Sequence, residues 1–546
     1  MNIVTLLSFV LFTALVAYMT WRITRGQGTD TEDGFFLAGR SLTGLVIAGS
    51  LLLTNLSTEQ LVGLNSDAFK EGLSVMAWEV MAGCSLVVMA LVFLPRYLRS
   101  GITTIPQFLE LRYGAGVRAL TTAVFIVAYM LILLPFVLYS GATALSGILD
   151  LPSLLGLEEY PTLCVVIGFI AVVGSAYAIF GGLRAVAVSD LFNGIGLLIG
   201  GLLITFFSIR YVANMEGTSF FGAFAEVKAD NPDAFVSLGK SGESVHWPTL
   251  FTGVLLLNFF YWCSNQQIIQ RTFGAKNLAE GQKGVLLAAF FKILAPIILI
   301  VPGIFALHIA MGDAEFNTSL LKEDGTQDGS KAYGELVQLV LPSPLTGFFA
   351  AVIVGSILST FNSVLNSSAT LFSLGVYKKV LTPGAGHSKV VRSGRICSIV
   401  VAILAAVAAP ITFWGRDSIF GYFQALNGVY FIPLLAIILV GMFTKWANGR
   451  SAMVVSILGL VLMLWGTFFS GGVIKNVFGS GFHFMGAVFV LLVVLQLVLG
   501  NSSMRRSEPY VQKDSSVVDL TPWRPARFVG GALIVSVLGL YVFFAK

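Results

Sequence analysis

The chain has 546 residues, of which 56% are hydrophobic and only 11% are charged, and its mean hydropathy is +0.86. Because about a quarter of the residues in soluble domains are charged, this composition excludes a soluble globular protein and predicts an all-α integral membrane protein. The net charge of +5 follows the loops, so we expect no nucleic-acid partner.

Apolar segments of membrane length follow one another along the whole chain. Each has about 20 residues or more, which is the length that a spanning helix needs. They lie at 3–21, 42–64, 75–95, 119–147, 161–180, 188–209, 249–268, 285–311, 344–373, 393–413, 417–443, 452–469, 481–500 and 528–545. The sequence therefore predicts about fourteen transmembrane helices. The first segment has no basic residue before it and no cleavage site, which favours a retained helix over a signal peptide.

The distribution of Lys and Arg predicts the orientation of the chain. With the N-terminus outside, most basic residues fall in inward loops, and Arg112 and Arg271 are assigned to these loops. This arrangement agrees with the positive-inside rule. We therefore expect both termini to lie outside. The two longest outward loops, 211–247 and 312–341, are expected either to cap the outer face or to be functionally inert.

A polar run interrupts the second apolar segment. In the stretch GSLLLTNLSTEQLVG (49–63), the polar residues are Asn55, Ser57, Thr58, Glu59 and Gln60. Such groups persist in a membrane only where they are buried in protein or line a cavity. The alternative is a loop between two shorter spans, but the apolar flanks are too short to cross a bilayer. The run predicts one broken helix, and no role is assigned to Glu59.

A second polar-bearing helix opens near residue 249, where LLLNFFYWCSNQQIIQRT runs from apolar into aromatic and amide residues. Five segments from each start, 42–209 and 249–443, would form two repeats of inverted topology, with a site at their interface. The predicted division is an N-terminal helix and loop (1–41), a first repeat (42–211), an outer loop (212–248), a second repeat (249–443) and three further helices (444–546).

Ionisable residues inside the apolar segments are few, and two of them stand out. Glu79 occurs in VMAWEVMAG and Lys292 in AAFFKILAP. A charge at a helix centre costs about 2.5–3.5 kcal/mol on insertion scales, so each is expected to face a polar cavity or a partner. The alternatives are an interfacial position for Glu79 and a side chain of Lys292 that extends to the cytoplasm along its stem.

Amide and aromatic side chains add a ligand-binding signal. Amides both donate and accept hydrogen bonds, which suits a neutral ligand with several hydroxyls, and the candidates are Asn55, Gln60, Asn258 and Gln424. Tyr261 and Trp262 could stack on the apolar face of a ring, although such aromatics more often pack between helices.

Hydroxyl residues crowd the segment VGSILSTFNSVLNSSATLFS (354–373). They either hold helices together or, at Ser359 and Thr360, present oxygens to a weakly held hard cation such as Na⁺, with backbone carbonyls of an unwound helix as further ligands. Asp190, in AVSDLFNG, either caps the N-terminus of its helix or lies on an ion path.

The joint pattern of motifs resembles the sodium:solute symporter family over nearly the whole chain. The motifs are NLSTEQLVG (55–63), TIPQFLELRYG (104–114), YAIFGGLRAVAVSD (177–190), FYWCSNQQIIQRT (260–272) and LNSSATLFS (365–373). The likeness is strongest to the bacterial sodium/galactose and sodium/glucose branch. It implies a leucine-transporter-type fold with two inverted five-helix repeats, a broken first core helix and additional helices, in a bacterial-type inner (plasma) membrane.

The resemblance also implies the roles of particular residues. The implied sugar contacts are Gln60, Glu79, Asn258, Lys292 and Gln424, with Asn55 nearby. Tyr261 is similar to the aromatic that stacks under the pyranose as an inner gate, supported by Asn55 and backed by Trp262. The implied sodium ligands are the carbonyls of Leu53, Leu56 and Ser356 and the hydroxyls of Ser359 and Thr360. Asp190 resembles the acidic residue on the sodium exit route.

The chain departs from this pattern at two positions near Glu79. Ala82 stands where such sugar symporters often have a serine, and Trp78 stands where a tyrosine is common. The hydroxyl pattern that is recognised is therefore expected to differ from that of galactose.

We expect a sodium-coupled symporter for a galactose- or glucose-like monosaccharide, with Na⁺ as the coupling ion, no organic cofactor and no obligatory protein partner. A sodium symporter for inositol, sialic acid or an organic acid is the alternative. A transporter-derived nutrient sensor, and an intramembrane enzyme that uses Glu79 and Lys292 as an acid–base pair, are the alternatives from other classes. No nucleophile motif, HExxH or phosphate loop accompanies that pair.

Overall fold

The computed structural model describes residues 3–25, 31–149, 151–321, 325–327, 329–415, 419–502, 506 and 508–545. The side chains of residues 58, 59, 176–182 and 330 lie outside this description, so the unassigned Glu59 is not among the described side chains. Within the described ranges the protein is a bundle of helices, with two isolated β-bridges and no β-sheet.

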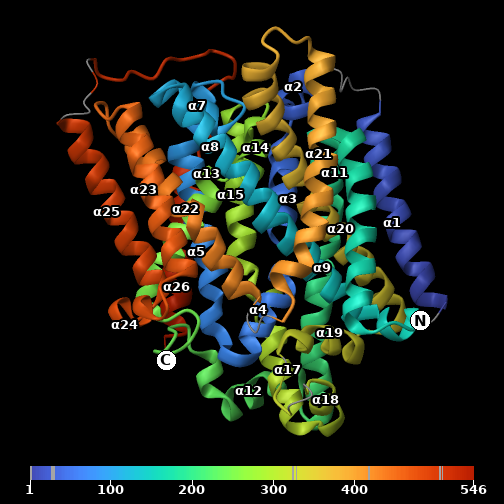
Figure 1. Cartoon of the computed structure of the whole chain (residues 1–546). Coiled ribbons are helices and arrows are strands. Elements are labelled where there is room, and N and C mark those ends of the chain that lie inside the picture. The colour runs from blue at the N-terminus through green and yellow to red at the C-terminus, as the bar shows by residue number, and fades with distance from the viewer. Residues whose placement is uncertain are drawn as a thin grey trace.

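The first part of the chain contains the first broken helix and the helices around it (Figure 1). The helices are α1 (Ile3–Thr24), α2 (Glu32–Leu37), α3 (Gly44–Asn55), α4 (Thr58–Glu71), α5 (Ala77–Val88), α6 (Leu94–Arg99), α7 (Ile105–Tyr113), α8 (Ala115–Ala128), α9 (Leu134–Leu149), α10 (Leu151–Leu155), α11 (Glu159–Met215) and α12 (Phe220–Asp230). Short 3-10 helices are η1 (Ala38–Arg40), η2 (Gly72–Met76), η5 (Pro232–Phe235) and η6 (Trp247–Phe251), and π-helices are η3 (Met89–Phe93) and η4 (Tyr129–Leu133).

The second part contains the second broken helix and the C-terminal helices. These are α13 (Gly253–Ser264), α14 (Gln266–Phe273), α15 (Leu278–Leu294), α16 (Pro296–Leu299), α17 (Val301–Gly312), α18 (Ala314–Ser319), α19 (Gly329–Val340), α20 (Ser343–Thr370), α21 (His387–Phe413), α22 (Ile419–Phe443), α23 (Gly449–Phe468), α24 (Val473–Phe478), α25 (Gly481–Asn501) and α26 (Ala526–Phe543). The π-helix η7 (Leu371–Leu381) continues α20.

The prediction of an all-α membrane protein is confirmed. Ten helical stretches of the described chain are long and apolar enough to cross a membrane, or eleven if the bent pair Leu278–Leu294 and Pro296–Gly312 is one span. Other predicted segments contain shorter apolar helices, among them Gly44–Asn55 and Glu159–Ser175. The count of fourteen crossings and the two inverted repeats stay predictions.

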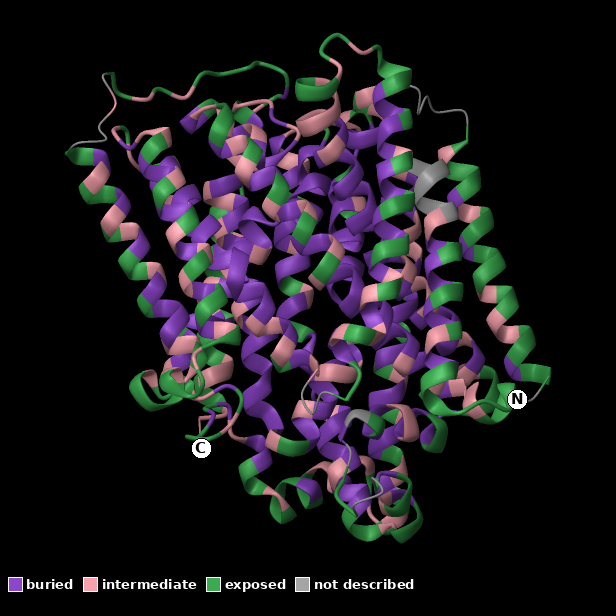
Figure 2. Ribbon diagram, viewed as in Figure 1, coloured by how far each residue is buried: buried purple, intermediate pink, exposed green. Residues whose placement is uncertain are grey.

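The outer rim of the bundle is apolar, as contact with lipid requires. Exposed positions follow one face of the peripheral helices, whereas buried positions fill the centre (Figure 2). Large exposed apolar residues on α1, α21 and α25 include Leu11, Ile411 and Val490. Apolar faces of this extent are not tolerated in water. They are suited to the hydrocarbon of a bilayer.

The polar run at 49–63 breaks a helix, as expected. α3 ends at Asn55, Leu56 leaves the helical conformation with ψ of 62°, and Ser57 is extended before α4 begins. α3 packs closely on α11, because a Cβ added at Gly49 would lie 2.9 Å from the Cα of Leu191. The absence of a side chain at Gly49 therefore lets the broken helix approach its neighbour.

The stretch that opens near residue 249 is broken as well. α13 ends at Ser264 and α14 starts at Gln266, with Asn265 extended between them. The two broken helices are tied together, because the N–H of Leu42 donates to Gly274 O at 2.9 Å and the N–H of Lys276 donates to Leu42 O at 3.1 Å. The start of α3 is thereby fixed to the end of α14.

The helix α11 packs along α20 at two places, one before and one after the middle of α11. A Cβ at Gly174 would lie 2.4 Å from a ring carbon of Phe361, and one at Gly196 would lie 2.9 Å from Val352. Asp190 lies inside α11, so the alternative that it caps a helix N-terminus is wrong.

Each of the two long segments predicted as outward loops contains helices. α12 lies in the first, and α18 and α19 lie in the second. In Figure 1 these helices gather at the lower end of the bundle, where the N- and C-termini also lie. The two ends of the chain are thus on one side of the molecule, while which side faces outside stays a prediction.

Candidate functional site

A small cavity lies where the two broken helices meet. Its walls come from the break of α3 and α4, from α5, η4, α13 and α22. The lining residues are Asn55, Gln60, Trp78, Glu79, Ala82, Leu133, Leu257, Asn258, Tyr261, Trp262, Phe423, Gln424, Asn427 and Phe431. All of the predicted sugar contacts except Lys292 are in this set. The structure thus brings together residues that are far apart in the sequence.

The central cavity contains almost no free space. Its volume is about 40 Å³, which is little more than the share of one water molecule in the liquid, about 30 Å³. Ligand pockets of drug size have about 300–1,000 Å³. The structure therefore shows the central cavity in a contracted conformation.

Two amides of the central cavity have unused hydrogen-bonding atoms. Asn55 Oδ1 and Gln60 Oε1 are buried and have no hydrogen-bond partner among the described residues. Asn258 donates through Nδ2 to Val254 O at 3.1 Å, and Asn427, which the sequence interpretation missed, donates to Gln424 Oε1 at 3.1 Å. Because buried polar groups are nearly always paired, the unused oxygens are suited to a ligand.

Glu79 and Lys292 form a buried ion pair beside the cavity. Lys292 Nζ donates to Glu79 Oε2 at 2.5 Å. The side chain of Lys292 is 0% exposed and that of Glu79 is 2% exposed. Lys292 Nζ also lies 5.5 Å from the ring centroid of Trp262. An interfacial Glu79 and a Lys292 that extends to the cytoplasm are therefore both wrong. The expectation that each of these side chains faces a partner is confirmed.

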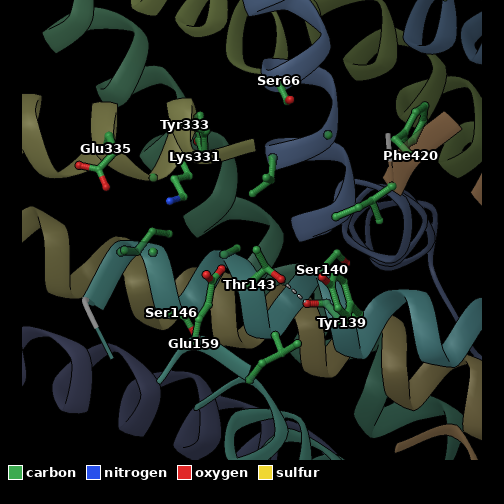
Figure 3. Close-up of a pocket in the computed structure, with 18 of the residues that line it drawn as sticks. Ser66, Tyr139, Ser140, Thr143, Ser146, Glu159, Lys331, Tyr333, Glu335 and Phe420 are labelled. Atoms are coloured by element: carbon green, nitrogen blue, oxygen red, sulfur yellow. Dashed lines mark hydrogen bonds between the residues drawn. The ribbon is translucent and has the colours of Figure 1, made fainter. Parts of the chain in front are cut away.

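An aromatic layer closes one side of the central cavity. Phe136 and Phe423 stack with their ring centroids 3.8 Å apart, and Trp78 meets Phe420 edge to face at 5.7 Å. Trp78 and Phe423 line the central cavity, whereas Phe136 and Phe420 line a larger cavity of about 830 Å³. The layer thus separates the contracted cavity from the larger one, part of which is shown in Figure 3. The sequence interpretation missed this layer.

The opposite side is closed by hydrogen bonds at the break of the second helix. Tyr129 donates to Asn265 Oδ1 at 2.5 Å and accepts from the backbone N–H of Gln267 at 3.0 Å. The side chain of Gln267 donates to Tyr261 Oη at 3.4 Å. This network holds Tyr261 at the wall of the cavity.

Ion pairs reinforce the same end of the bundle. Glu110 on α7 pairs with Arg118 on α8 and with Lys379 on η7, the latter at 2.7 Å. Burial alone would raise the pKa of the Glu110 carboxyl, but its hydrogen bonds with Lys379 and Arg118 outweigh burial and hold the pKa below its usual value. The end of α20 and η7 is therefore fastened to α7 and α8.

The predicted sodium ligands meet where α20 passes the first helix break. Ser356 Oγ donates to Leu56 O and Thr360 Oγ1 donates to Thr54 O, both at 3.1 Å. Ser359 Oγ is buried and makes no hydrogen bond within the described part of the chain. Because the last four carbonyls of a helix lack intrahelical partners, the end of α3 offers oxygens to the same place.

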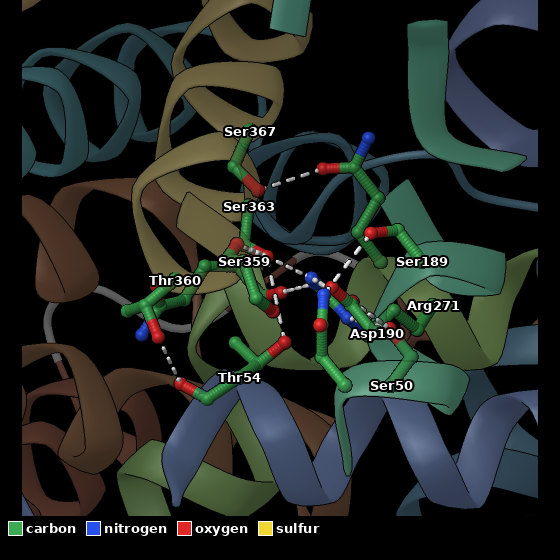
Figure 4. Close-up of polar contacts among 12 residues, drawn as sticks. Ser50, Thr54, Ser189, Asp190, Arg271, Ser359, Thr360, Ser363 and Ser367 are labelled. Atoms are coloured by element: carbon green, nitrogen blue, oxygen red, sulfur yellow. Dashed lines mark hydrogen bonds and ion pairs between the residues drawn. The ribbon is translucent and has the colours of Figure 1, made fainter. Parts of the chain in front are cut away.

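A buried ionic network adjoins these oxygens and contains an arginine that was assigned to a loop (Figure 4). Arg271 is 0% exposed on α14. Its guanidinium donates to Ser50 Oγ at 2.6 Å and to Ser363 Oγ, and it lies 3.5 Å from Asp190 Oδ2. The loop assignment of Arg271 is wrong, since counting basic residues cannot distinguish a buried guanidinium from an exposed one.

Asp190 completes the network. Ser50 Oγ donates to its Oδ2 at 2.5 Å, and Ser363, which binds Arg271, donates to Ser359 O at 2.6 Å. Asp190 is thus linked to the predicted sodium ligand Ser359 through Arg271 and Ser363, and its carboxylate also interacts with the Ser359 hydroxyl. Its suggested role on an ion path stays a prediction.

Arg112 was likewise assigned to an inward loop and is 0% exposed. It lies on α7 and donates to the carbonyls of Gly441, Thr444 and Ala447 at 2.8, 3.1 and 2.7 Å. These carbonyls lie at or beyond the C-terminal end of α22, where backbone oxygens need external donors. Arg112 therefore caps a helix end.

A bundle of membrane-length helices that surrounds two broken helices and a small polar cavity between them is the architecture of a transporter of small polar solutes. The family model that is described as the sodium:solute symporter family matches residues 35–459. The chain belongs to the sodium:solute symporter family.

Curated relatives agree with this assignment. The chain is 39% identical to the uncharacterized symporter YidK of Escherichia coli (strain K12), over all of this chain and 92% of that protein. It is 31% identical to a sodium/glucose cotransporter of Vibrio parahaemolyticus, over 83% of each chain. These relatives are transporters, so the enzyme alternative is set aside.

A solved structure shows the same fold. The structure of a Na⁺-coupled sialic acid symporter in a substrate-bound outward-open state matches 93% of this chain and 99% of that chain, with a TM-score of 0.74 and 18% sequence identity. The protein is thus a multi-pass membrane symporter of this fold.

Proposed function

We propose that the protein is a sodium-coupled symporter that imports a neutral monosaccharide, a hexose similar to galactose or glucose, by alternating access. The observation that carries this proposal is the composition of the central cavity. Amides, a paired carboxylate and ammonium group, and two adjacent aromatic rings line or adjoin one closed space next to the break of α3.

The central cavity offers the chemistry that a sugar requires. Hydroxyl groups both donate and accept hydrogen bonds, and so do the amides of Gln60, Asn258 and Gln424. In the contracted cavity Glu79 and Lys292 bind each other, and a sugar hydroxyl that enters would accept from Lys292 or donate to Glu79. Tyr261, backed by Trp262 at a centroid distance of 5.2 Å, offers a ring face to the pyranose.

The proposed sodium ligands are uncharged oxygens from two elements. The carbonyls of Leu53, Leu56 and Ser356 would act together with the hydroxyls of Ser359 and Thr360. The unpartnered Ser359 hydroxyl and the carbonyls released at the helix break fit a hard cation. A set without a carboxylate suits an ion that has to leave again on the inner side.

Coupling follows if both ligands stabilise the same conformation. Na⁺ would hold α20 against the first broken helix. The sugar, bound in the central cavity on the other side of the broken helix, would hold the aromatic layer closed. If each ligand prefers this closed state, each raises the affinity for the other by the same factor. One positive charge that moves inward through 100 mV supplies about 2.3 kcal/mol. Accumulation of a neutral sugar is therefore energetically feasible.

The second candidate in the same class is a sodium symporter for inositol, sialic acid or an organic acid. Ala82 and Trp78 both line the cavity, so the two departures from the sugar pattern lie where they can alter selectivity. Glu79 disfavours a carboxylate next to it, which favours the neutral solutes. A transporter-derived sensor is distinguished from all of these by the absence of net uptake.

The test is uptake by the purified protein in liposomes with an inward sodium gradient. Labelled galactose and glucose are compared with inositol and sialic acid, and each measurement is repeated with choline in place of Na⁺. The proposal expects concentrative uptake of a hexose that needs Na⁺ and increases with an inside-negative potential. Full-rate uptake in choline would refute coupling, and selective uptake of another solute would favour the second candidate.

A further inference from the structure

Three consecutive residues just before α3 have a left-handed backbone conformation. Their φ angles are 54° at Ala38, 61° at Gly39 and 50° at Arg40. In residues other than glycine this conformation brings Cβ too close to the following carbonyl oxygen, and it normally occurs at single residues. Within the described ranges, Ser516 in the connector before α26 is the one further non-glycine residue with a positive φ. The left-handed turn formed by residues 38–40 is therefore a strained segment of the backbone.

The helix before the left-handed turn is joined to α20, η7 and α21. Glu32 on α2 pairs with Lys378 on η7 at 2.8 Å, and His387 Nδ1 at the start of α21 lies 3.0 Å from Glu32 Oε1. Phe35 and Phe36 of α2 pack in one buried apolar cluster with residues of α20 and α21. Charged and apolar contacts thus fix α2 on this side of the turn.

The helix after the left-handed turn is joined to α14 and α15. Glu280 at the start of α15 accepts from the N–H of Gly44 at the start of α3 at 2.7 Å. The backbone hydrogen bonds of Leu42 join α3 to the segment that follows α14. α3 also packs closely on α15, because a Cβ at Gly284 would lie 2.7 Å from Ile47. The left-handed turn therefore lies between a helix joined to α20 and α21 and a helix joined to α14 and α15.

Gln270 on α14 connects the two sides. Its Nε2 donates to Phe36 O at 2.9 Å and to Thr370 Oγ1 on α20 at 2.8 Å. Ser367 on α20 donates to Gln270 Oε1 at 2.9 Å (Figure 4). A movement of α14 away from α20 therefore has to break these hydrogen bonds.

Arg40 holds the left-handed turn in its conformation. Its Nη1 donates to Phe273 O at the end of α14 at 3.2 Å, and its Nη2 donates to Gly101 O between α6 and α7 at 3.1 Å. Strained residues persist only where surrounding contacts fix them, and they are common in switch regions. When α14 moves, the contact with Phe273 changes and the turn is free to leave the left-handed conformation.

We propose that the left-handed turn is a hinge, which stores strain in this conformation and releases it when α3 and α14 move away from α20. Alternating access requires such a movement, because the network of Tyr129, Asn265 and Gln267 closes the central cavity at the break before α14. The strain lowers the free-energy difference between the closed and the open arrangement. This role rests on alternating access as part of the proposed function, and not on the identity of the solute.

The experiment measures how often α14 and α20 separate. The full chain with Ser367→Cys is placed in lipid nanodiscs, and the rate at which N-ethylmaleimide labels the new cysteine is followed by mass spectrometry. Ser367 is 1% exposed, so the cysteine reacts when this contact opens. The four native cysteines give the background, measured in the chain without Ser367→Cys. The labelling requires no solute.

Two substitutions in the left-handed turn should shift the labelling rate in opposite directions. Glycine adopts the left-handed conformation freely, so Ala38→Gly removes strain and should slow labelling at least threefold. Gly39→Ala adds strain without a clash, because a Cβ at Gly39 would meet nothing within 4 Å, and it should accelerate labelling at least threefold. The matched control is Ser516→Gly, which relieves a φ of 54° far from the hinge and should leave the rate unchanged.

The sign of the change decides the outcome, and either variant suffices. Labelling at the parent rate in Ala38→Gly and Gly39→Ala would overturn the hinge, and so would an equal change in Ser516→Gly. Opposite shifts without any uptake of a hexose would support the hinge and refute the proposed function. Sodium-dependent uptake of a hexose together with unchanged labelling would support the proposed function and overturn the hinge.

Discussion

At the scale of single residues, the most consequential contact is the ion pair of Glu79 and Lys292. The two residues are 213 positions apart and almost fully buried. Burying both charges is costly, but removing only one is costlier, because the remaining charge has no partner and no water. Each charge is thus compensated by the other in the contracted cavity. In the proposed function the same two groups also bind the sugar hydroxyls.

We expect Glu79→Ala and Lys292→Ala each to lower the free energy of unfolding by about 3–5 kcal/mol and to abolish sodium-dependent sugar binding. The double variant should be destabilised by less than the sum of the two single variants. Thermal unfolding in detergent and binding of labelled sugar measure these effects. Strict additivity in stability, or normal uptake by both single variants, would contradict the assigned roles.

The control for this prediction is Lys283→Ala. Lys283 pairs with Glu280 at 2.8 Å, but both side chains are partly exposed. Exposed pairs contribute about 0–1 kcal/mol, so the variant should unfold and transport nearly as the parent does.

Arg271 is a second residue for which the surrounding contacts predict the effect of a substitution. We expect Arg271→Met to destabilise the protein by about 3–5 kcal/mol, because Asp190 would remain buried without its cation. Arg271→Lys keeps the charge but cannot reach Ser50 and Ser363 together, so it should be intermediate. Thermal unfolding measures both.

Adding Asp190→Asn to Arg271→Met should restore part of the stability, and no restoration would argue against the ion pair. The exposed Arg392 provides the matched control. Arg392→Met should change the free energy of unfolding by less than about 0.5 kcal/mol.

At the scale of elements, α20 and the first broken helix form one unit. Hydroxyls of α20 reach the carbonyls that α3 leaves without intrahelical partners, at Thr54 and Leu56. The same helix continues into η7, whose Lys378 pairs with Glu32 on α2 at 2.8 Å. The proposed ion site at the helix break is thereby connected along α20 to contacts at the end of the bundle that holds α2 and α7.

We expect Ser359→Ala to raise the sodium concentration for half-maximal uptake about tenfold, equivalent to about 1.4 kcal/mol, with little change in the maximal rate at saturating Na⁺. The reason is that one proposed sodium ligand is removed while the helix contacts remain. The control is Ser368→Ala on the same helix, whose hydroxyl donates to Val364 O at 2.9 Å and should leave the sodium dependence unchanged. Equal sodium dependence in both variants would remove Ser359 from the ion site.

At the scale of the whole molecule, the two ends of the bundle differ. The termini, the helices of the two long segments and the larger cavity gather at one end, and α2, α7 and the connector before α26 lie at the other. The aromatic layer and the network around Tyr129 close the central cavity toward these two ends. Alternating access requires that only one of these closures opens at a time.

We expect the end with the termini to face outside. Ser241→Cys, in the segment before α13, should react with a membrane-impermeant maleimide on intact cells, because that position is exposed at this end. Val511→Cys, 73% exposed in the connector before α26, should react only after permeabilisation. The parent chain, with Cys84, Cys164, Cys263 and Cys397, measures the background. The reverse labelling pattern would invert the predicted orientation.

The sequence by itself determined the class of architecture and most of the central cavity. Its hydropathy required a helical membrane protein, and the polar run at 49–63 required a broken helix, because hydrocarbon does not tolerate unpaired polar groups. The motifs of the family resemblance then indicated Gln60, Glu79, Asn258 and Gln424, which meet in one cavity.

Only the tertiary structure decided which groups compensate one another. Arg271 looks like a loop residue in a charge count, and its burial depends on Asp190, Ser50 and Ser363, which lie on three other helices. The aromatic layer likewise arises between α5, α9 and α22, and the larger cavity arises between α4, α9, α19 and α22. The sequence shows which polar or bulky groups must be placed in the membrane, and each of these costs free energy. Which partner offsets that cost depends on contacts between segments that are far apart in the sequence.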